Sequence, residues 1–381
     1  MGRLECEGAD FGTGNTIDYE KMFHTRYRIL HMAYQRAVTN GITETDDYHS
    51  FVKKNESWLP DYALFMALKD ANHGKSWSEW EEGIRNRRPE ALEEAGQKYK
   101  TDIGFYEFVQ YEFFRQWDAL KKYANEQGIQ IIGDIPIYVA FDSADTWSDT
   151  KQFQLDEENL PSAVAGCPPD GFAADGQLWG NPLYRWEYHR QTGYAWWVSR
   201  LAYCYQLYDI VRIDHFRGFD EYFSIPYGDK TAHNGHWEKG PGIELFWRVK
   251  ECLGEKEVIA EDLGYVTDSV RQLVRDTGYP GMKVLEFAFD SRDTGSAGDY
   301  LPHNYPVNSV VYTGTHDNET ALGWYQNASI REQVFFSRTA PCEGENPALR
   351  MIALAMRSKA GLVIIPMQDW LCLDNSARMN T

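Results

Sequence analysis

The sequence has few cysteines and no long apolar run. Six cysteines are scattered through 381 residues with no close pair, which fits neither a zinc knuckle nor a disulfide framework in a chain this long. No stretch approaches the roughly 20 apolar residues that cross a membrane. The opening residues also lack the apolar core of a signal peptide. We therefore expect reduced thiols, a cytoplasmic location and no membrane partner.

Positive charge is also scarce. Lys and Arg total 38 against 57 Asp and Glu, so the formal net charge is −19. A field of this sign repels nucleic acids and other polyanions, whereas a neutral ligand meets no such barrier. The phosphate-binding patterns GxxxxGK[ST] and GxGxxG after a strand are absent, so nucleotide chemistry has no support.

Metal-binding patterns are missing as well. His215 and His316 each adjoin an aspartate, and these are reasonable ligand types, but no HExxH or HxxxH spacing occurs. We expect no catalytic metal. Aromatic residues, in contrast, are plentiful, with 13 Trp, 24 Tyr and 19 Phe. Their flat faces stack on sugar rings, although packing in the core is the more common use of any single one.

Two regions differ in pattern. From Ile17 to Gly128 the apolar spacing is helical and no strand is indicated; the clearest helix covers Thr101 to Gln127. After Gly128, short apolar runs alternate with segments of helix length, which is typical of βα units and a parallel sheet. The six runs are Ile129 to Ile137, Asp209 to Asp214, Glu257 to Glu261, Met282 to Ala288, Ser309 to Thr313 and Leu362 to Ile365.

The predicted fold class is α/β, an incomplete (β/α)8 barrel of the TIM type, because a closed barrel needs eight strands and the sequence indicates about six. We predict a helical insertion subdomain at 1–128 and a catalytic barrel domain at 129–381. The barrel contains an insertion at about 143–200. The Gly- and Pro-rich part of this insertion, residues 166–182, is predicted to form an ordered loop that acts as a lid over the site.

Acidic residues end three of the apolar runs: Asp214, Glu261 and Asp317. Carboxyl ends of parallel strands meet at one rim, so three carboxylates are expected to converge there, as glycosidic-bond chemistry requires. Arg212 lies two residues before Asp214 and shares its face of the strand. We expect this guanidinium to lower the pKa of Asp214 and keep it ionised as a nucleophile. A buried Arg–Asp ion pair without catalytic function is the alternative.

Glu261 follows an apolar run, and burial there should raise its pKa so that it serves as acid and then base. Asp262 is its rival by sequence, but we expect it to face the other way and to cap a helix. A Gly-containing turn places His316 and Asp317 at the mouth, where both side chains can bind sugar hydroxyl groups. Capping of the next helix by Asp317 and Asn318 is an equal alternative from the sequence alone.

Longer motifs resemble a known family. They are GDIPIYVAFDSADTW from Gly133, PPDGFAADGQLWGNPLY from Pro168, VRIDHFRG from Val211, IAEDLG from Ile259 and TGTHDNET from Thr313. Together they resemble the 4-α-glucanotransferases of the amylomaltase or disproportionating-enzyme type, which are relatives of the α-amylases. The resemblance covers nearly the whole chain.

The resemblance implies transfer of a segment of an α-1,4-glucan to the 4-hydroxyl group of a glucan or glucose, with retention and without a cofactor. It implies Asp214 as nucleophile, Glu261 as acid/base and Asp317 as stabiliser of the transition state. The implied substrate-binding residues are Arg212, His316, Asp134, Trp179, Gln177, Asn181 and Asp170.

Family members have two further strands before the helical region and a segment after ARMN, so the resemblance predicts a chain truncated at both ends that turns over substrate poorly. A retaining α-glucan hydrolase and an inactive glucan-binding fragment are the competing hypotheses. The sequence leaves open the preferred glucan length, cyclic products, the balance of transfer and hydrolysis, and the oligomeric state.

Overall fold

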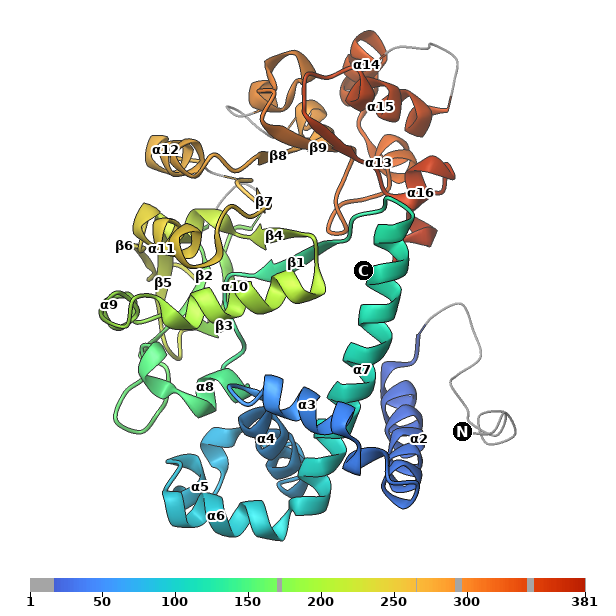
Figure 1. Cartoon of the computed structure of the whole chain (residues 1–381). Coiled ribbons are helices and arrows are strands. Elements are labelled where there is room, and N and C mark those ends of the chain that lie inside the picture. The colour runs from blue at the N-terminus through green and yellow to red at the C-terminus, as the bar shows by residue number, and fades with distance from the viewer. Residues whose placement is uncertain (1–16, 170–172, 265, 292–296, 341–345, 381) are drawn as a thin grey trace. The chain divides into compact units, whose positions relative to one another are not determined.

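The computed structural model describes residues 17–169, 173–264, 266–291, 297–340 and 346–380 (Figure 1). The chain divides into two compact units. One consists of Met1–Ile129 with Val139–Pro161, and the other consists of Gln130–Tyr138 with Ser162–Thr381.

The first unit is helical, and between residues 17 and 129 the structure has no strand, as predicted. Its helices are α2 (Tyr19–Thr39), α3 (Asp46–Lys54), α4 (Leu59–Ala71), α5 (Glu82–Arg85), α6 (Pro89–Lys98), α7 (Lys100–Glu126) and α8 (Ala144–Ser148). The long helix predicted from Thr101 to Gln127 is confirmed as α7, and it ends before Gly128, whose φ of 75° favours glycine.

Aromatic packing forms the core of this unit. Phe105 of α7 is 1% exposed and packs with Tyr106 and with Ala63 of α4. A second cluster joins Trp147 of α8, which is fully buried, to Phe65 of α4. Residues 139–161 therefore complete the core of the helical unit.

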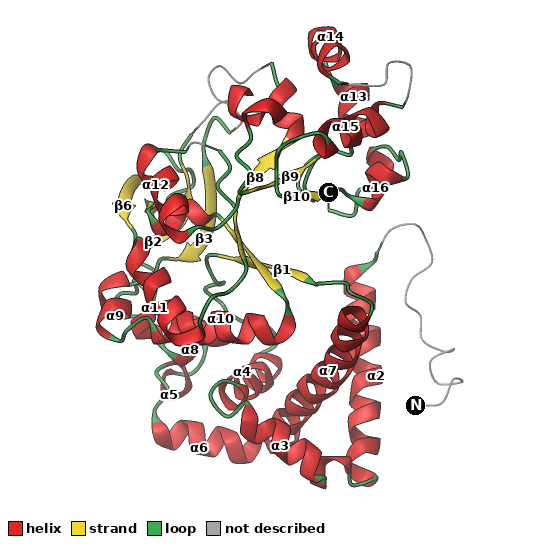
Figure 2. Ribbon diagram, turned by 45° about the horizontal axis from the view of Figure 1, so that its top comes forward, coloured by secondary structure: helices red, strands yellow, loops and turns green. Residues whose placement is uncertain are grey.

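The second unit contains a parallel sheet whose strand order, β1-β4-β7-β8-β9-β10, follows the chain. Its strands are among those drawn in yellow in Figure 2. Its strands are β1 (Ile132–Pro136), β4 (Ile210–Asp214), β7 (Val258–Ala260), β8 (Gly281–Val284), β9 (Ser309–Tyr312) and β10 (Leu362–Ile364). Five of them lie within predicted runs, and β8 begins at Gly281, one residue before the run that starts at Met282. Six adjacent parallel strands with helices between them match an incomplete (β/α)8 barrel, so the predicted fold class is confirmed.

The sequence did not predict the second, antiparallel sheet, whose order is β3-β2-β5-β6. Its strands are β2 (Ala163–Cys167), β3 (Gln177–Pro182), β5 (Glu221–Pro226) and β6 (His236–Lys239). The interpretation of 166–182 as one loop was therefore wrong at both ends, because Cys167 pairs with Gln177 in a hairpin. Gly166 permits this pairing, since a Cβ atom there would lie 2.0 Å from the carbonyl oxygen of Gln177.

The helices of this unit follow its strands. They are α9 (Trp186–Gln191), α10 (Ala195–Leu207), α11 (Ile243–Leu253), α12 (Asp268–Thr277), α13 (Ala321–Asn327), α14 (Ile330–Thr339), α15 (Pro347–Met356) and α16 (Met367–Trp370). Local signals set several of their starts: Ser329 and Glu332 form a reciprocal capping box at α14. Among the described residues, no helix is both long and apolar enough to cross a membrane.

Candidate active site

Asp134, Arg212 and Asp214 lie together on β1 and β4. The parallel register pairs Asp134 with Arg212, two residues before Asp214. Arg212 donates from Nη1 to both carboxylate oxygens of Asp134, at 2.6 and 2.7 Å, and its Nη2 lies 3.1 Å from Oδ1 of Asp214. Arg212 is only 8% exposed, and its chain neighbours Val211 and Ile213 are fully buried. The predicted alternation along β4 is confirmed: the guanidinium joins two carboxylates on one face.

The expected net lowering of the Asp214 pKa was wrong. The protein surrounding its carboxyl group raises this pKa more than Arg212 lowers it, and the charge of Asp134 adds to the increase. The Asp214 side chain nevertheless remains 45% exposed. Arg212 thus offsets part of the cost of burying an ionised Asp214, and it shares its charge with Asp134.

Glu261 comes directly after β7 and is 9% exposed. One carboxylate oxygen accepts a hydrogen bond from the backbone N–H of His215 at 2.8 Å, and the other accepts from the N–H of Leu263 at 2.7 Å. His215 has φ of 53°, a left-handed conformation that is uncommon outside glycine. Burial, followed by the charge of Asp214, raises the pKa of Glu261 to about 7, the direction that the sequence predicted.

Asp262 does not cap a helix, so that part of the prediction was wrong. Its carboxylate accepts from the backbone N–H of Met282 on β8 at 2.7 Å, and Thr267 caps α12 instead. Met282 follows Gly281, where a Cβ atom would lie 2.5 Å from an Asp262 carboxylate oxygen. Asp262 therefore binds the neighbouring strand, and Glu261 remains the acid that contacts the backbone beside Asp214.

His316 and Asp317 occupy the turn after β9. Both side chains are exposed, at 56% and 65%, and Nε2 of His316 lies 3.3 Å from a carboxylate oxygen of Asp317. Thr320, not Asp317 or Asn318, caps α13, so the capping alternative was wrong. Asn318 instead closes the turn by accepting from the N–H of Thr315 at 2.9 Å.

Two residues that the sequence did not single out hold this turn. Nδ2 of Asn380 donates to Oδ1 of Asp317 at 3.0 Å, and Nη2 of Arg378 donates to the Asp317 carbonyl oxygen at 3.3 Å. Both belong to the motif ARMN, which the sequence gave no reason to place beside residue 317. These hydrogen bonds join residues 61 and 63 positions apart, and no short sequence pattern predicts a contact over that separation.

The structure brings part of the predicted set together in one hollow of about 440 Å³. Its lining includes Asp134, Arg212 and His316 from the predicted set, with Arg378 and Asn380 from the additional pair. The three candidate catalytic carboxylates are not among its lining residues. They are connected electrostatically, because the charge of Asp317 raises the pKa of Asp214 and the charge of Asp214 raises that of Glu261.

Gln177, Trp179 and Asn181 belong to β3, whose pairing with β2 changes register between Leu178 and Pro182, where Gly180 has φ of 78°. The indole Nε1 of Trp179 donates to Gln177 at 2.9 Å. Its ring meets the imidazole of His215 edge to face, with centroids 4.8 Å apart. Trp179 therefore adjoins His215, which follows Asp214 in the chain and donates its backbone N–H to Glu261. Asp170 lies outside the described residues.

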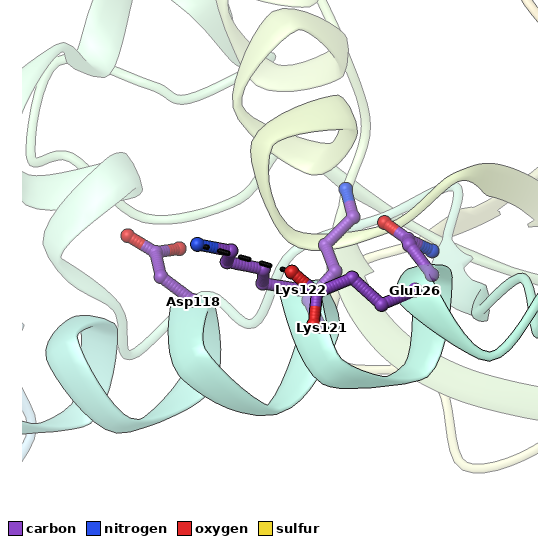
Figure 3. A pocket seen from close by; sticks show the side chains of 5 residues that line it. Asp118, Lys121, Lys122 and Glu126 are labelled. Carbon is purple, nitrogen blue, oxygen red and sulfur yellow. Dashed lines mark ion pairs between the residues drawn. The ribbon is translucent and has the colours of Figure 1, made fainter.

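The helical unit has a hollow of its own, of about 550 Å³, along α7 (Figure 3). Asp118, Lys121, Lys122, Asn125 and Glu126 line it. Lys122 and Glu126 form an ion pair at 3.9 Å, a spacing typical of an exposed helix face. We assign no chemistry to this hollow. No group of three or more His, Cys, Asp or Glu side chains is arranged to hold a metal ion in the described part of the chain.

Comparisons with known proteins point to one family. The protein-family profile described as 4-alpha-glucanotransferase matches residues 3–381. The 4-alpha-glucanotransferase of Clostridium butyricum is 44% identical over 382 residues, covering 99% of this chain and 77% of the relative. That of Thermus thermophilus is also 44% identical and covers 100% of this chain and 77% of the relative. The structure of the Streptococcus agalactiae amylomaltase in complex with acarbose matches with a TM-score of 0.93 at 37% identity, covering 100% of this chain and 77% of that one.

Proposed function

The chain belongs to the 4-alpha-glucanotransferase family, and from this premise we propose how its site transfers a segment of an α-1,4-glucan. The donor is an α-1,4-glucan or maltooligosaccharide, and the acceptor is the 4-hydroxyl group of another glucan or of glucose. The acarbose complex of the S. agalactiae relative supports an oligosaccharide ligand. The reaction runs in two displacements and therefore retains the anomeric configuration.

In the first displacement, a carboxylate oxygen of Asp214 attacks the anomeric carbon of the donor. As that bond forms, the glycosidic C–O bond breaks, and Glu261 gives its proton to the departing oxygen. The products are a covalent glucosyl–Asp214 ester, an ionised Glu261 and a shortened glucan with a free 4-hydroxyl group. The buried environment that raises the pKa of Glu261 to about 7 keeps its proton available for this step.

In the second displacement, the carboxylate of Glu261 takes the proton of the acceptor 4-hydroxyl group. The acceptor oxygen attacks the anomeric carbon, the ester bond to Asp214 breaks, and both carboxyl groups return to their starting states. The first displacement leaves the negative charge on Glu261 in place of Asp214, and the second returns it to Asp214. Their mutual interaction favours one ionised and one protonated carboxyl group at a time.

The remaining residues bind the sugars in this proposal. Asp317 and His316 hold ring hydroxyl groups, and the Asp317 contact strengthens as the ring flattens. Arg212 and Asp134 bind the same sugar from the rim of the hollow. Trp179 offers an indole face for stacking. Gln177, Asn181 and Asp170 are proposed to bind neighbouring sugars.

A single observation carries the assignment: Glu261 is a buried glutamate held by two backbone N–H groups, and its pKa is raised first by burial and then by the charge of Asp214 at the end of the adjacent strand. The test incubates the purified protein with maltotriose and separates the products. Glucose together with maltooligosaccharides longer than maltotriose establishes transfer, whereas glucose and maltose alone indicate the hydrolase alternative. No reaction would favour the glucan-binding alternative.

The Asp214→Asn variant is expected to lose at least roughly 1000-fold in transfer while it still binds maltotriose, because the amide is a far weaker nucleophile. The matched control is Asp276→Asn on the exposed face of α12, where Asp276 accepts a side-chain hydrogen bond from Gln272. Residual turnover of Asp214→Asn comparable to that of this control would show that the nucleophile is misassigned.

Several finer expectations stay predictions within this proposal. Glucose as an acceptor is tested by adding labelled glucose to the maltotriose reaction and following its entry into longer products. Exclusion of nucleic acid and membrane partners is supported by the net charge of −19. A cytoplasmic location is supported by the scattered cysteines. Cell fractionation tests the location.

A further inference from the structure

A buried glutamate that the proposed reaction does not use lies behind the turn that carries Asp317. Glu286 belongs to a 3-10 helix, Leu285–Phe289, that directly follows β8. It is 5% exposed, and its backbone N–H donates to the carbonyl oxygen of Thr313 at 3.2 Å. Thr313 is the first residue after β9 and the start of the segment that leads to Asp317. Glu286 is therefore attached to this segment by its own backbone.

The side chain of Glu286 also lies against this segment. At Gly314, a Cβ atom would be 2.8 Å from Oε1 of Glu286 and 3.2 Å from the carbonyl oxygen of Glu319. A side chain there would displace the Glu286 carboxyl group, so glycine lets the turn rest against it. The carbonyl oxygen of Glu319, which also borders this position at Gly314, accepts hydrogen bonds but cannot donate them.

The surroundings of this carboxyl group disfavour a negative charge. Oε1 is buried and receives no hydrogen bond from any described residue. Asp369, which is fully buried, and Glu319 face it with negative charge, and Arg378 is the cation that opposes them. Asp369 already accepts from Thr313 Oγ1 at 2.5 Å and from the Ala321 N–H at 2.8 Å.

The charged neighbours of Glu286 form hydrogen bonds with other groups. Glu319 accepts from Asn327 and Asn375, each at 2.5 Å, and Arg378 donates to the carbonyl oxygen of Asp317. Burial first, and then the charges of Asp369 and Glu319, raise the pKa of Glu286 well above its ordinary value. A protonated carboxyl group turns one of its oxygens into a donor, which suits a site bordered by acceptors.

We propose that Glu286 is a positioning residue for Asp317: its carboxyl group, in the protonated form, supports the turn from Thr313 to Thr320 by packing against Gly314 and donating a hydrogen bond into the turn. This inference rests on the proposed function for the role of Asp317. The protonated state of Glu286 does not depend on that role and is tested separately.

The first test measures the thermal midpoint of unfolding against pH for the wild type and for Glu286→Gln. In the folded protein the carboxyl group keeps its proton above about pH 4.5, whereas in the unfolded chain it loses it. The folded state therefore binds more protons, and stability falls as pH rises from the ordinary pKa to the raised one. Glutamine cannot ionise, so the variant escapes this fall.

The expected result is a midpoint difference, variant minus wild type, that increases with pH from about 5 upward. The matched control is Glu90→Gln on the exposed start of α6, for which the difference should stay flat. If the midpoint difference for Glu286→Gln is equally independent of pH, the proposal that Glu286 is protonated in the folded protein is wrong. Infrared difference spectra add a direct readout: the spectrum of the wild type minus that of Glu286→Gln should contain the C=O band of one protonated buried acid, because the bands of the other acids, Glu261 among them, cancel.

The second test separates positioning from a merely structural role by kinetics with maltotriose. Glu286→Gln keeps the size and a donor, so kcat should remain within about twofold of the wild type. Glu286→Ala removes the support and should lower kcat roughly tenfold or more at nearly unchanged KM, because a displacement of ~1 Å at a catalytic group costs up to about 100-fold. An unchanged kcat for folded Glu286→Ala would overturn the positioning role.

The two tests also distinguish failures. If the wild type shows no transfer at all, the proposed function fails, while the midpoint series still decides whether Glu286 is protonated. Asp317→Asn provides the link: it should abolish transfer yet leave the pH dependence of the Glu286→Gln midpoint difference unchanged. If that pH dependence is lost in Asp317→Asn, the protonation of Glu286 is not independent of Asp317.

Discussion

At the scale of single residues, Glu261 makes the sharpest prediction. Its pKa of about 7 means that its proton is largely lost above neutral pH. Cleavage of a glycosidic bond needs this proton on the departing oxygen, so kcat for glucan donors should fall as pH rises through about 7. The pH profile of initial rates with maltotriose measures this.

A control for that profile uses a donor that needs no proton. Fluoride leaves an α-glucosyl fluoride without general acid help, so formation of the glucosyl ester from this donor should not require protonated Glu261. Glu261→Gln is expected to release fluoride while losing most activity on maltotriose. Equal losses with both donors would mean that Glu261 is not the acid.

The sequence located Asp214, Glu261, Asp317 and Arg212 because each is a polar residue at or near the end of an apolar run, and such ends share one edge of a parallel sheet. It misjudged the pKa of Asp214 because burial depends on neighbours from other strands. It also missed Glu286, which ends no run and whose buried environment arises from three distant segments.

At the scale of elements, close packing makes a testable contrast between two glycines. In β1, a Cβ atom at Gly133 would lie 2.0 to 2.3 Å from three ring atoms of Tyr208, which follows α10. In α6, a Cβ atom at Gly96 would meet nothing within 4 Å. Gly133→Ala should therefore destabilise the protein by about 1 to 3 kcal/mol or more through overpacking.

Gly96→Ala should have the opposite sign and stabilise by about 0.5 to 1 kcal/mol, since alanine loses less backbone freedom on helix formation. Urea unfolding of both variants, with the midpoint and the slope reported for each, measures the contrast. A neutral Gly133→Ala would mean that Tyr208 moves aside without cost, and the close approach of β1 would then not constrain the sheet.

The hairpin of β2 and β3 carries the second prediction at this scale. In the connection between these strands, the carbonyl oxygen of Asp175 accepts from the N–H of Ala232 at 3.0 Å, and its carboxylate lies 3.1 Å from Nε2 of His233. We expect the connection 168–176 to favour transfer by excluding water from the glucosyl ester. Replacing it with a two-residue turn should lower the ratio of transfer to hydrolysis products from maltotriose. An unchanged ratio would remove the lid hypothesis.

At the scale of the whole molecule, the six parallel strands were predictable because each run is short, apolar and separated from the next by a helix-length segment. The antiparallel sheet was not. Its strands contain glycine and polar residues, such as Gly166 and Ser224, and the pairing of β2 with β5, which joins its two hairpins, is between segments that are remote in the sequence. The extent of the helical unit was equally hidden, because Trp147 enters its core through contacts that no periodicity records.

The net charge of −19 provides the last prediction, since it acts on the whole surface. A neutral glucan has no long-range interaction with this field, so kcat/KM for maltotriose should change by less than about twofold between roughly 0.05 and 0.5 M salt. A phosphorylated maltooligosaccharide should instead react slowly at low salt and faster as salt screens the repulsion. If the anionic donor were favoured at low salt, a local positive potential around Arg212 and Arg378 would outweigh the mean field, and the expected preference for neutral substrates would be wrong.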